Sequence, residues 1–198
     1  TSFSGHMDPF GYLGYFHERE ANGFRETNSD FEVLGGGLKT TFGQPAPARV
    51  GGGPGTTDPR WTLGYDEYHE EHGEPGGLTK AVADSEGRDQ TTRFHDRFRL
   101  ERYYGTLRYE QDLGETSQFD FRTFGGHYRR YSKRQRGGGF GTLPTGANAN
   151  TNSIEEQDFY TFGFEPRIRH SYEAFGQEGQ TLTAGLLTYF SDSPREDQ

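Results

Sequence analysis

The chain has 198 residues, a formal net charge of −9 and 29% hydrophobic residues, with a mean hydropathy of −1.02. Low hydropathy with 30 glycines is typical of disordered chains, but 17 Phe and 12 Tyr argue against disorder, because disordered segments are poor in aromatics. The absence of cysteine excludes a disulfide framework and a thiolate metal site.

The N-terminal part contains two predicted strands. Residues 10–17 alternate with a period of two, but both faces are apolar, so the direction of each face stays open. Residues 18–31 are polar and predict a loop, and residues 32–42 predict the next strand. The Pro/Gly-rich segment 44–59 is a flexible linker in preference to a domain boundary, because the same alternation resumes at Arg60.

The strand after the linker has an apolar face formed by Trp61, Leu63 and Tyr65. Residues 69–96 then predict a long polar loop. The run His69–His72 resembles a metal motif, but its spacing is not HExxH and no helix is predicted to bring both imidazoles together. A polar loop tip is the favoured interpretation of this run, and an accidental surface ion site is the alternative.

The longest alternating stretch runs from Arg97 to about Tyr131. Its first half places Tyr103 and Leu107 on one face, and residues 111–117 predict a short turn before the alternation resumes. The two strands, each about a dozen residues or more, form a long hairpin. Strands of soluble proteins typically run about five or six residues, whereas a tilted strand needs roughly nine to eleven to cross a bilayer.

The C-terminal third repeats this rhythm. Residues 132–157 predict a long loop, residues 160–172 predict a strand, and residues 173–179 predict a short turn. The last strand carries Thr183 on one side. Its other, apolar side is formed by Leu182, Leu186 and Phe190.

Short and long connections therefore mostly alternate, as in outer-membrane barrels; only segment 44–59 is long where a short turn is expected. Since no apolar run approaches the ~20 residues of a membrane helix, a membrane-embedded form of this chain has to be a barrel. The prediction is an all-β fold: an antiparallel transmembrane β-barrel segment of about seven long strands, joined as up-and-down hairpins with long outer loops.

Three runs, FRLERYYGTLRYE, KRQRGGGFGTLPTGA and EEQDFYTFGFEPRIRH, closely resemble the barrel of TonB-dependent outer-membrane receptors, in particular the ferric dicitrate type. The resemblance extends from DPFGYLGYF to TAGLLTYFSDSPRED, nearly the whole chain. The TonB box and plug domain of that family do not appear, and its barrel has about 22 strands. Residues 1–198 are therefore expected to be a partial receptor barrel domain.

The resemblance implies import of a ferric chelate, iron dicitrate or a siderophore, across a Gram-negative-type outer membrane. The implied partners are the chelate, outer-membrane lipid, and TonB acting through a plug domain outside this chain. Nucleic acid, a cofactor, a metal site and enzymatic activity are not expected, and no GxSxG elbow is present. Two alternatives stay open: a self-contained small porin or adhesin barrel, and an outer-membrane enzyme of the phospholipase kind.

Five cations lie within eight residues, and we call them the basic cluster: Arg129, Arg130, Lys133, Arg134 and Arg136. The alternation directs Arg130 toward the lumen and Arg129 toward the membrane interface, and it leaves Arg134 and Arg136 in the loop. Clustered positive charge attracts anions, and Arg pairs bidentately with carboxylates. A receptor mouth would therefore use Arg130, Lys133, Arg134 and Arg136 to bind an anionic chelate.

Two other interpretations of the basic cluster stay open. The cations would contact lipid head groups or solvate a loop, or they would bind nucleic-acid phosphates while Tyr128, Tyr131 and Phe140 stack on bases. The net charge of −9 and the β pattern argue against nucleic acid.

Overall fold

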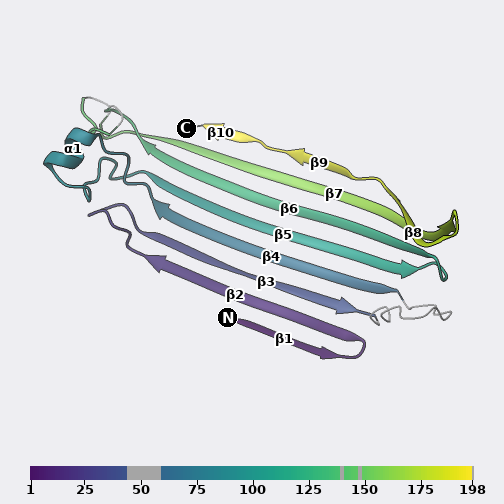
Figure 1. The fold of residues 1–198 in the computed structure, drawn as a ribbon. Helices are drawn as coiled ribbons and strands as arrows, with labels where there is room; N and C mark the ends of the chain where they lie inside the picture. Colours follow the sequence, from purple (N-terminus) through teal and green to yellow (C-terminus); the bar gives the residue numbers. More distant parts are fainter. Residues whose placement is uncertain (44–58, 139–140, 147–148, 198) are drawn as a thin grey trace.

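The computed structural model describes residues 1–43, 59–138, 141–146 and 149–197. Figure 1 shows its strands lying side by side in one long sheet, with a short helix at one end. The strands and the helix are β1 (Ser2–Met7), β2 (Phe10–Ala21), β3 (Phe31–Phe42), β4 (Arg60–Gly73), α1 (Lys80–Ser85), β5 (Arg97–Asp112), β6 (Ser117–Gln135), β7 (Asn152–Ala174), β8 (Gln177–Gly185), β9 (Thr188–Asp192) and β10 (Arg195–Asp197).

The sheet confirms the predicted all-β, antiparallel, up-and-down architecture. Strands β1 to β7 lie in sequence order, each antiparallel to the next. Strands β8, β9 and β10 all pair with β7 and keep one register apart from a shift between Tyr172 and Ala174, so they share one position. The sheet therefore has eight strand positions, seven for β1 to β7 and one shared by β8 to β10. About seven strands were predicted, and the additional one is β1.

Two prolines explain why the last strand is broken. Pro166 of β7 has no N–H to donate across the sheet, although its carbonyl still accepts a hydrogen bond from the N–H of Leu186 at 3.1 Å. The second break contains Pro194, whose carbonyl accepts from the N–H of Asp158 at 3.1 Å. The chain thus continues in register past both interruptions.

Several strands extend into segments that the alternation of apolar residues predicts to be loops. Strand β2 reaches Ala21, inside the predicted loop 18–31, and β4 reaches Gly73. The run His69–His72 is therefore part of a strand, and its interpretation as a loop tip was wrong. The helix α1, capped by the Thr79 side chain, was not predicted either. Among the described residues, no helix is long and apolar enough to cross a membrane.

The predicted loop 132–157 is also shorter in the structure. Strand β6 continues to Gln135 and β7 begins opposite it at Asn152. Both faces are polar there, so alternation of apolar residues gives no signal, while backbone pairing continues regardless of side-chain type. The linker prediction for residues 44–59 lies almost wholly outside the described residues.

Long and short connections gather at opposite ends of the sheet (Figure 1). We call the end at the left of Figure 1 the loop end. It holds residues 22–30, 74–96, 136–138, 141–146 and 149–151. The other end, which we call the turn end, holds the short turns at 8–9, 113–116 and 175–176. This separation confirms the predicted asymmetry for the connections that the structure describes.

The register sorts side chains into two faces. One transverse row of register partners on the apolar face consists of Tyr12, Thr40, Leu63, Leu107, Thr123 and Phe164. The adjacent row on the polar face consists of Gly11, Thr41, Thr62, Arg108, Arg122 and Glu165. The pairing of β2 with β3 also shows which side of β2 belongs to the apolar face: it is the side of Phe10, Tyr12 and Phe16.

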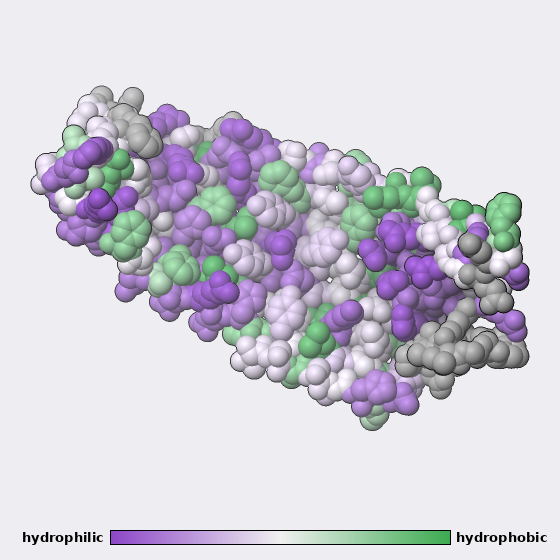
Figure 2. All heavy atoms as spheres, in the orientation of Figure 1, coloured by the Kyte–Doolittle hydropathy of each residue, from purple (hydrophilic) through white to green (hydrophobic). Residues whose placement is uncertain are grey.

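The described part of the chain buries no hydrophobic side chain. On the apolar face, Leu63 is 55% exposed, Phe162 57% and Phe190 65%. Figure 2 accordingly shows hydrophobic residues at the surface, between hydrophilic ones, along the length of the molecule. An exposed apolar surface of this extent marks a contact with an apolar medium or a partner.

The sheet ends in two strands that have one neighbour each among the described residues, β1 and the strand formed by β8 to β10. Unpaired N–H and C=O groups on such edges template aggregation and cannot be satisfied by hydrocarbon. We expect the isolated 198-residue polypeptide, refolded into detergent, to elute as aggregates in size-exclusion chromatography with light scattering. A monodisperse, heat-modifiable, ion-conducting monomer would contradict this expectation and favour a self-contained small barrel.

Candidate functional site

The basic cluster lies at the loop end, where the strand register divides it between two faces. Arg130 and Arg134 lie on the polar face, and Arg129 and Lys133 lie on the other side of β6. Arg136 follows the strand. The prediction that Arg134 lies in a loop was wrong, because pairing of β6 with β7 continues one residue beyond it.

Most of the clustered arginines are paired with carboxylates. Arg130 forms an ion pair with Glu155, which also contacts Arg195 at 3.2 Å. The guanidinium of Arg134 lies 2.8 Å from Glu74. On the other face, Arg129 approaches Glu156 at 3.6 Å and Asp158 at 3.8 Å.

The carboxylates at the start of β7 fall inside the predicted loop 132–157, where they would be solvated charges, but the register places them in a strand. Adjacent strand residues point to opposite faces, so Glu155 and Glu156 meet the adjacent Arg130 and Arg129 one on each side. In the sequence, the pattern is two consecutive cations on one strand and two consecutive acids on the antiparallel strand beside it. Strand ends are needed to recognise it.

The paired arginines still present positive charge at the surface. The side chains of Arg134 and Arg130 are 54% and 34% exposed, against 27% for Glu155 and 26% for Glu74. An external carboxylate would therefore reach the guanidinium groups first and share them with acids already in place. Such partly exposed charges attract anions in a salt-dependent manner.

A network of polar contacts joins the loops around this cluster. The side-chain amide of Asn28 donates toward three carbonyls, those of Arg93 at 2.7 Å, Asp96 at 2.9 Å and Glu74 at 3.2 Å. Asn28 takes a positive φ of 55°, a conformation that Asn tolerates better than most residues. Segment 22–30 is thereby fixed to segment 74–96.

The loop after β6 joins the same network. The Asp96 side chain accepts a hydrogen bond from the N–H of Gln135, and the Gln135 amide donates to the carbonyl of Ala149 at 2.8 Å. Asp96, Thr91 and Thr92 are at most 5% exposed, which makes them the most buried polar residues of the described chain. The loops therefore form a fixed platform around the cations.

Among the described residues, no three His, Cys, Asp or Glu side chains come together in a way that would hold a metal ion. The His72 ring instead contacts the neighbouring Glu70 at 3.0 Å within β4.

Replacing Asn28 tests the platform. Asn28→Gly keeps the positive φ accessible but removes the amide, so we expect faster proteolysis and faster amide exchange in segments 22–30 and 74–96. A hydrogen bond of this kind typically contributes about 0.5–1.5 kcal/mol to stability. Asn22→Gly, at an exposed position in the same connection, is the control. Equal protection in both variants, by hydrogen-exchange mass spectrometry, would show that Asn28 does not hold the loops.

No protein-family model matches the sequence, and no curated protein matches it either. In structure, the chain is similar to the crystallised ferric citrate transporter FecA in its unliganded form, with a TM-score of 0.72 and 20% sequence identity. The similarity covers 100% of this chain and 26% of that chain, so this chain spans about a quarter of the transporter's length. At this identity the similarity establishes the fold: an antiparallel sheet of the kind found in a β-barrel transporter.

Proposed function

We propose that residues 1–198 form part of the wall of a TonB-dependent outer-membrane barrel that imports a ferric chelate, iron dicitrate or a siderophore. The observation that carries the proposal is a long antiparallel sheet with one apolar and one polar face and no buried core in the described residues, similar throughout to a ferric citrate transporter. A polar lumen and a lipid-facing exterior account for this combination.

Aromatic side chains on the apolar face support a membrane location. Near the turn end, the rings of Trp61 and Tyr109 lie 4.5 Å apart, and further along, those of His127 and Tyr160 lie 4.7 Å apart. On β6, the eight steps from Phe119 to His127 cover about 26 Å at roughly 3.3 Å per residue. A strand tilt of about 40° reduces this to about 20 Å, close to the ~25 Å apolar band of outer-membrane barrels.

The polar face supports a lumen. Arg102 of β5 pairs with Asp66 at 2.6 Å and lies over the Tyr68 ring at 5.6 Å, about halfway along the sheet. Side chains of this type cannot face hydrocarbon without a large desolvation cost. Water or another part of a receptor would cover this face, and the plug domain implied by the sequence resemblance would do so and couple the barrel to TonB.

The basic cluster would form part of the chelate-binding mouth. Arg130 and Arg134 lie on the polar face at the loop end and Arg136 follows β6, whereas Lys133, predicted as a further ligand, lies on the other side of the strand. Charge-assisted pairing of these guanidinium groups with chelate carboxylates would provide both attraction and orientation. No step of this mouth requires a cofactor, and no enzymatic activity is proposed.

A pair of substitutions in the last strand tests the lipid face. Leu186 is 61% exposed on the apolar side, whereas Thr183 lies on the polar side opposite Arg169. In the intact membrane protein, Leu186→Arg should lower the free energy of unfolding by about 2–4 kcal/mol near the bilayer midplane. Thr183→Arg should cost much less. Equal costs in a lipid-vesicle unfolding titration would contradict the proposed orientation.

Substitutions in the basic cluster test the mouth. In the intact receptor, Arg130→Ala or Arg134→Ala should weaken binding of a labelled ferric chelate roughly ten- to a hundredfold, since each would remove a charge-assisted pair. Arg129→Ala, on the opposite face, should change the affinity little. Added salt should weaken binding to the wild-type protein. Unchanged affinity in all three variants would leave the cluster as a lipid-contacting or solubility feature.

A further inference from the structure

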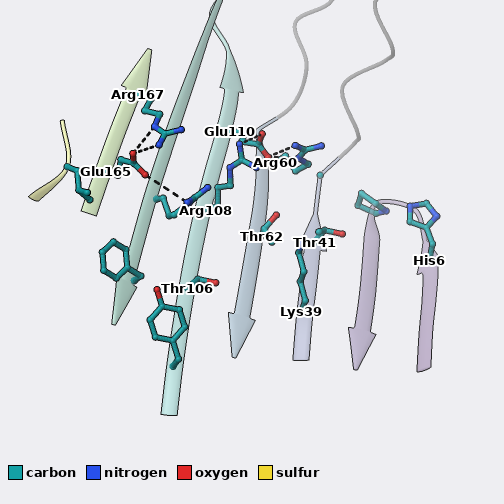
Figure 3. Close-up of a pocket in the computed structure, with 16 residues that line it drawn as sticks. His6, Lys39, Thr41, Arg60, Thr62, Thr106, Arg108, Glu110, Glu165 and Arg167 are labelled. Carbon is teal, nitrogen blue, oxygen red and sulfur yellow. Dashed lines mark hydrogen bonds and ion pairs between the residues drawn. The ribbon is translucent and has the colours of Figure 1, made fainter. Parts of the chain in front are cut away.

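A second group of cations lies on the polar face at the turn end, away from the basic cluster. A cleft of about 850 Å³ opens there, lined by Lys39 of β3, Arg60 of β4, Arg108 of β5, Arg122 of β6 and Arg167 of β7. Figure 3 shows Lys39, Thr41, Thr62 and Thr106 on adjacent strands along this surface, with Arg60 and Glu110 paired above them. Two carboxylates line the same cleft, those of Glu110 and Glu165.

Two of these arginines face each other directly across a strand pair. Arg108 and Arg122 are register partners on β5 and β6, and like charges directly opposite one another are normally destabilising. Acids at their sides offset the repulsion around Arg108. Its side chain donates to Asp120 at 2.6 Å and lies 3.0 Å from Glu110.

The acids lie deep in the wall while the guanidinium groups project from it. The side chains of Glu110, Glu165 and Asp120 are 10%, 15% and 16% exposed. Those of Arg108, Arg122 and Arg167 are 40%, 44% and 48% exposed. The cleft therefore presents mainly positive charge to anything that enters it.

Arg122 is the most weakly paired of the arginines in the cleft. Its guanidinium is 3.9 Å from Glu165, whereas Arg167 donates to the same carboxylate at 2.8 Å. Lys39 lines the cleft from β3 and makes no ion pair with any described residue. Between them, the hydroxyl of Thr106 and the rings of Tyr104 and Phe124 line the wall. An anion would find donors on two sides and an apolar surface for its carbon skeleton.

We propose that this cleft binds a small organic anion with at least two carboxylate or phosphate groups. One group pairs with Arg122, beside the acid-supported Arg108, and a second is held by Lys39 from β3. Planar guanidinium groups pair bidentately with either kind of oxyanion. The site requires no iron and lies at the opposite end of the sheet from the proposed mouth, so its test is separate from chelate binding there; it does require that whatever covers the polar face leaves this cleft open.

Cysteine protection tests the site in the intact protein in its membrane. Thr106→Cys places a thiol of nearly the same size in the cleft, and this chain contains no cysteine; accessible cysteines elsewhere in the protein are replaced first. A negatively charged methanethiosulfonate reagent should modify the Thr106→Cys thiol about tenfold or more faster than a positively charged one, because clustered cations concentrate anions. Citrate and pyrophosphate, added without metal, should each slow the modification. Ser85→Cys, in the helix α1 at the loop end, is the control thiol.

Second substitutions then assign the cations. Arg122→Ala and Lys39→Ala should each raise the citrate concentration for half protection about tenfold or more, as expected for loss of a charge-assisted pair. Arg122→Lys should restore part of the effect, and Arg129→Ala on the opposite face should change nothing. Protection by citrate but not pyrophosphate would assign a carboxylate ligand, and the reverse a phosphate ligand.

The proposal is overturned if neither anion protects the thiol or if Arg122→Ala leaves protection unchanged. The outcome is independent of chelate binding at the loop end. Arg134→Ala should alter binding of the ferric chelate without altering protection of the Thr106→Cys thiol. Failure at one end of the sheet therefore does not count for or against the other.

Discussion

Hydrogen bonding between neighbouring strands is the interaction on which this structure depends. The described residues bury no hydrophobic side chain, so no core holds the strands together from within. From β1 to β7, each strand is instead fixed by a ladder to its neighbour, from six paired residues between β1 and β2 to nineteen between β6 and β7. Side chains then follow the backbone, because alternate residues must face opposite sides. The face on which each side chain lies, and with it the distribution of charge over the sheet, therefore follows from this register.

Charge is arranged in the same way at both ends of the polar face. Short acids lie close to the wall and longer arginines extend over them, as Glu110 and Arg108 do near the turns and Glu155 and Arg130 do near the loops. Removing one partner of such a pair leaves a charge uncompensated, which costs more than the pair itself contributes. The acids therefore stabilise the wall and orient the cations, while the surface that a solute meets stays positive.

Alternation in the sequence was enough to predict the all-β fold, the two faces and the grouping of Leu182, Leu186 and Phe190. It failed where both faces are polar, and β4 and β6 therefore extend further than predicted. The ion pair of Arg130 with Glu155 could not be predicted without those strand ends, since it depends on register. The Asn28 network is of another kind, because its three acceptors are backbone carbonyls that no residue pattern encodes.

The transverse row from Tyr12 to Phe164 has a consequence for how such a sequence changes during evolution. Inserting or deleting one residue inside a strand would turn every following side chain to the other face and carry arginines into the apolar side. Insertions and deletions are therefore tolerated in the connections between strands, or as two residues at a time within a strand. Single substitutions are nearly unconstrained when the new residue keeps the apolar or polar character of its face. A sequence can diverge far under that rule and keep its shape, in keeping with 20% identity over a chain that superposes along its whole length.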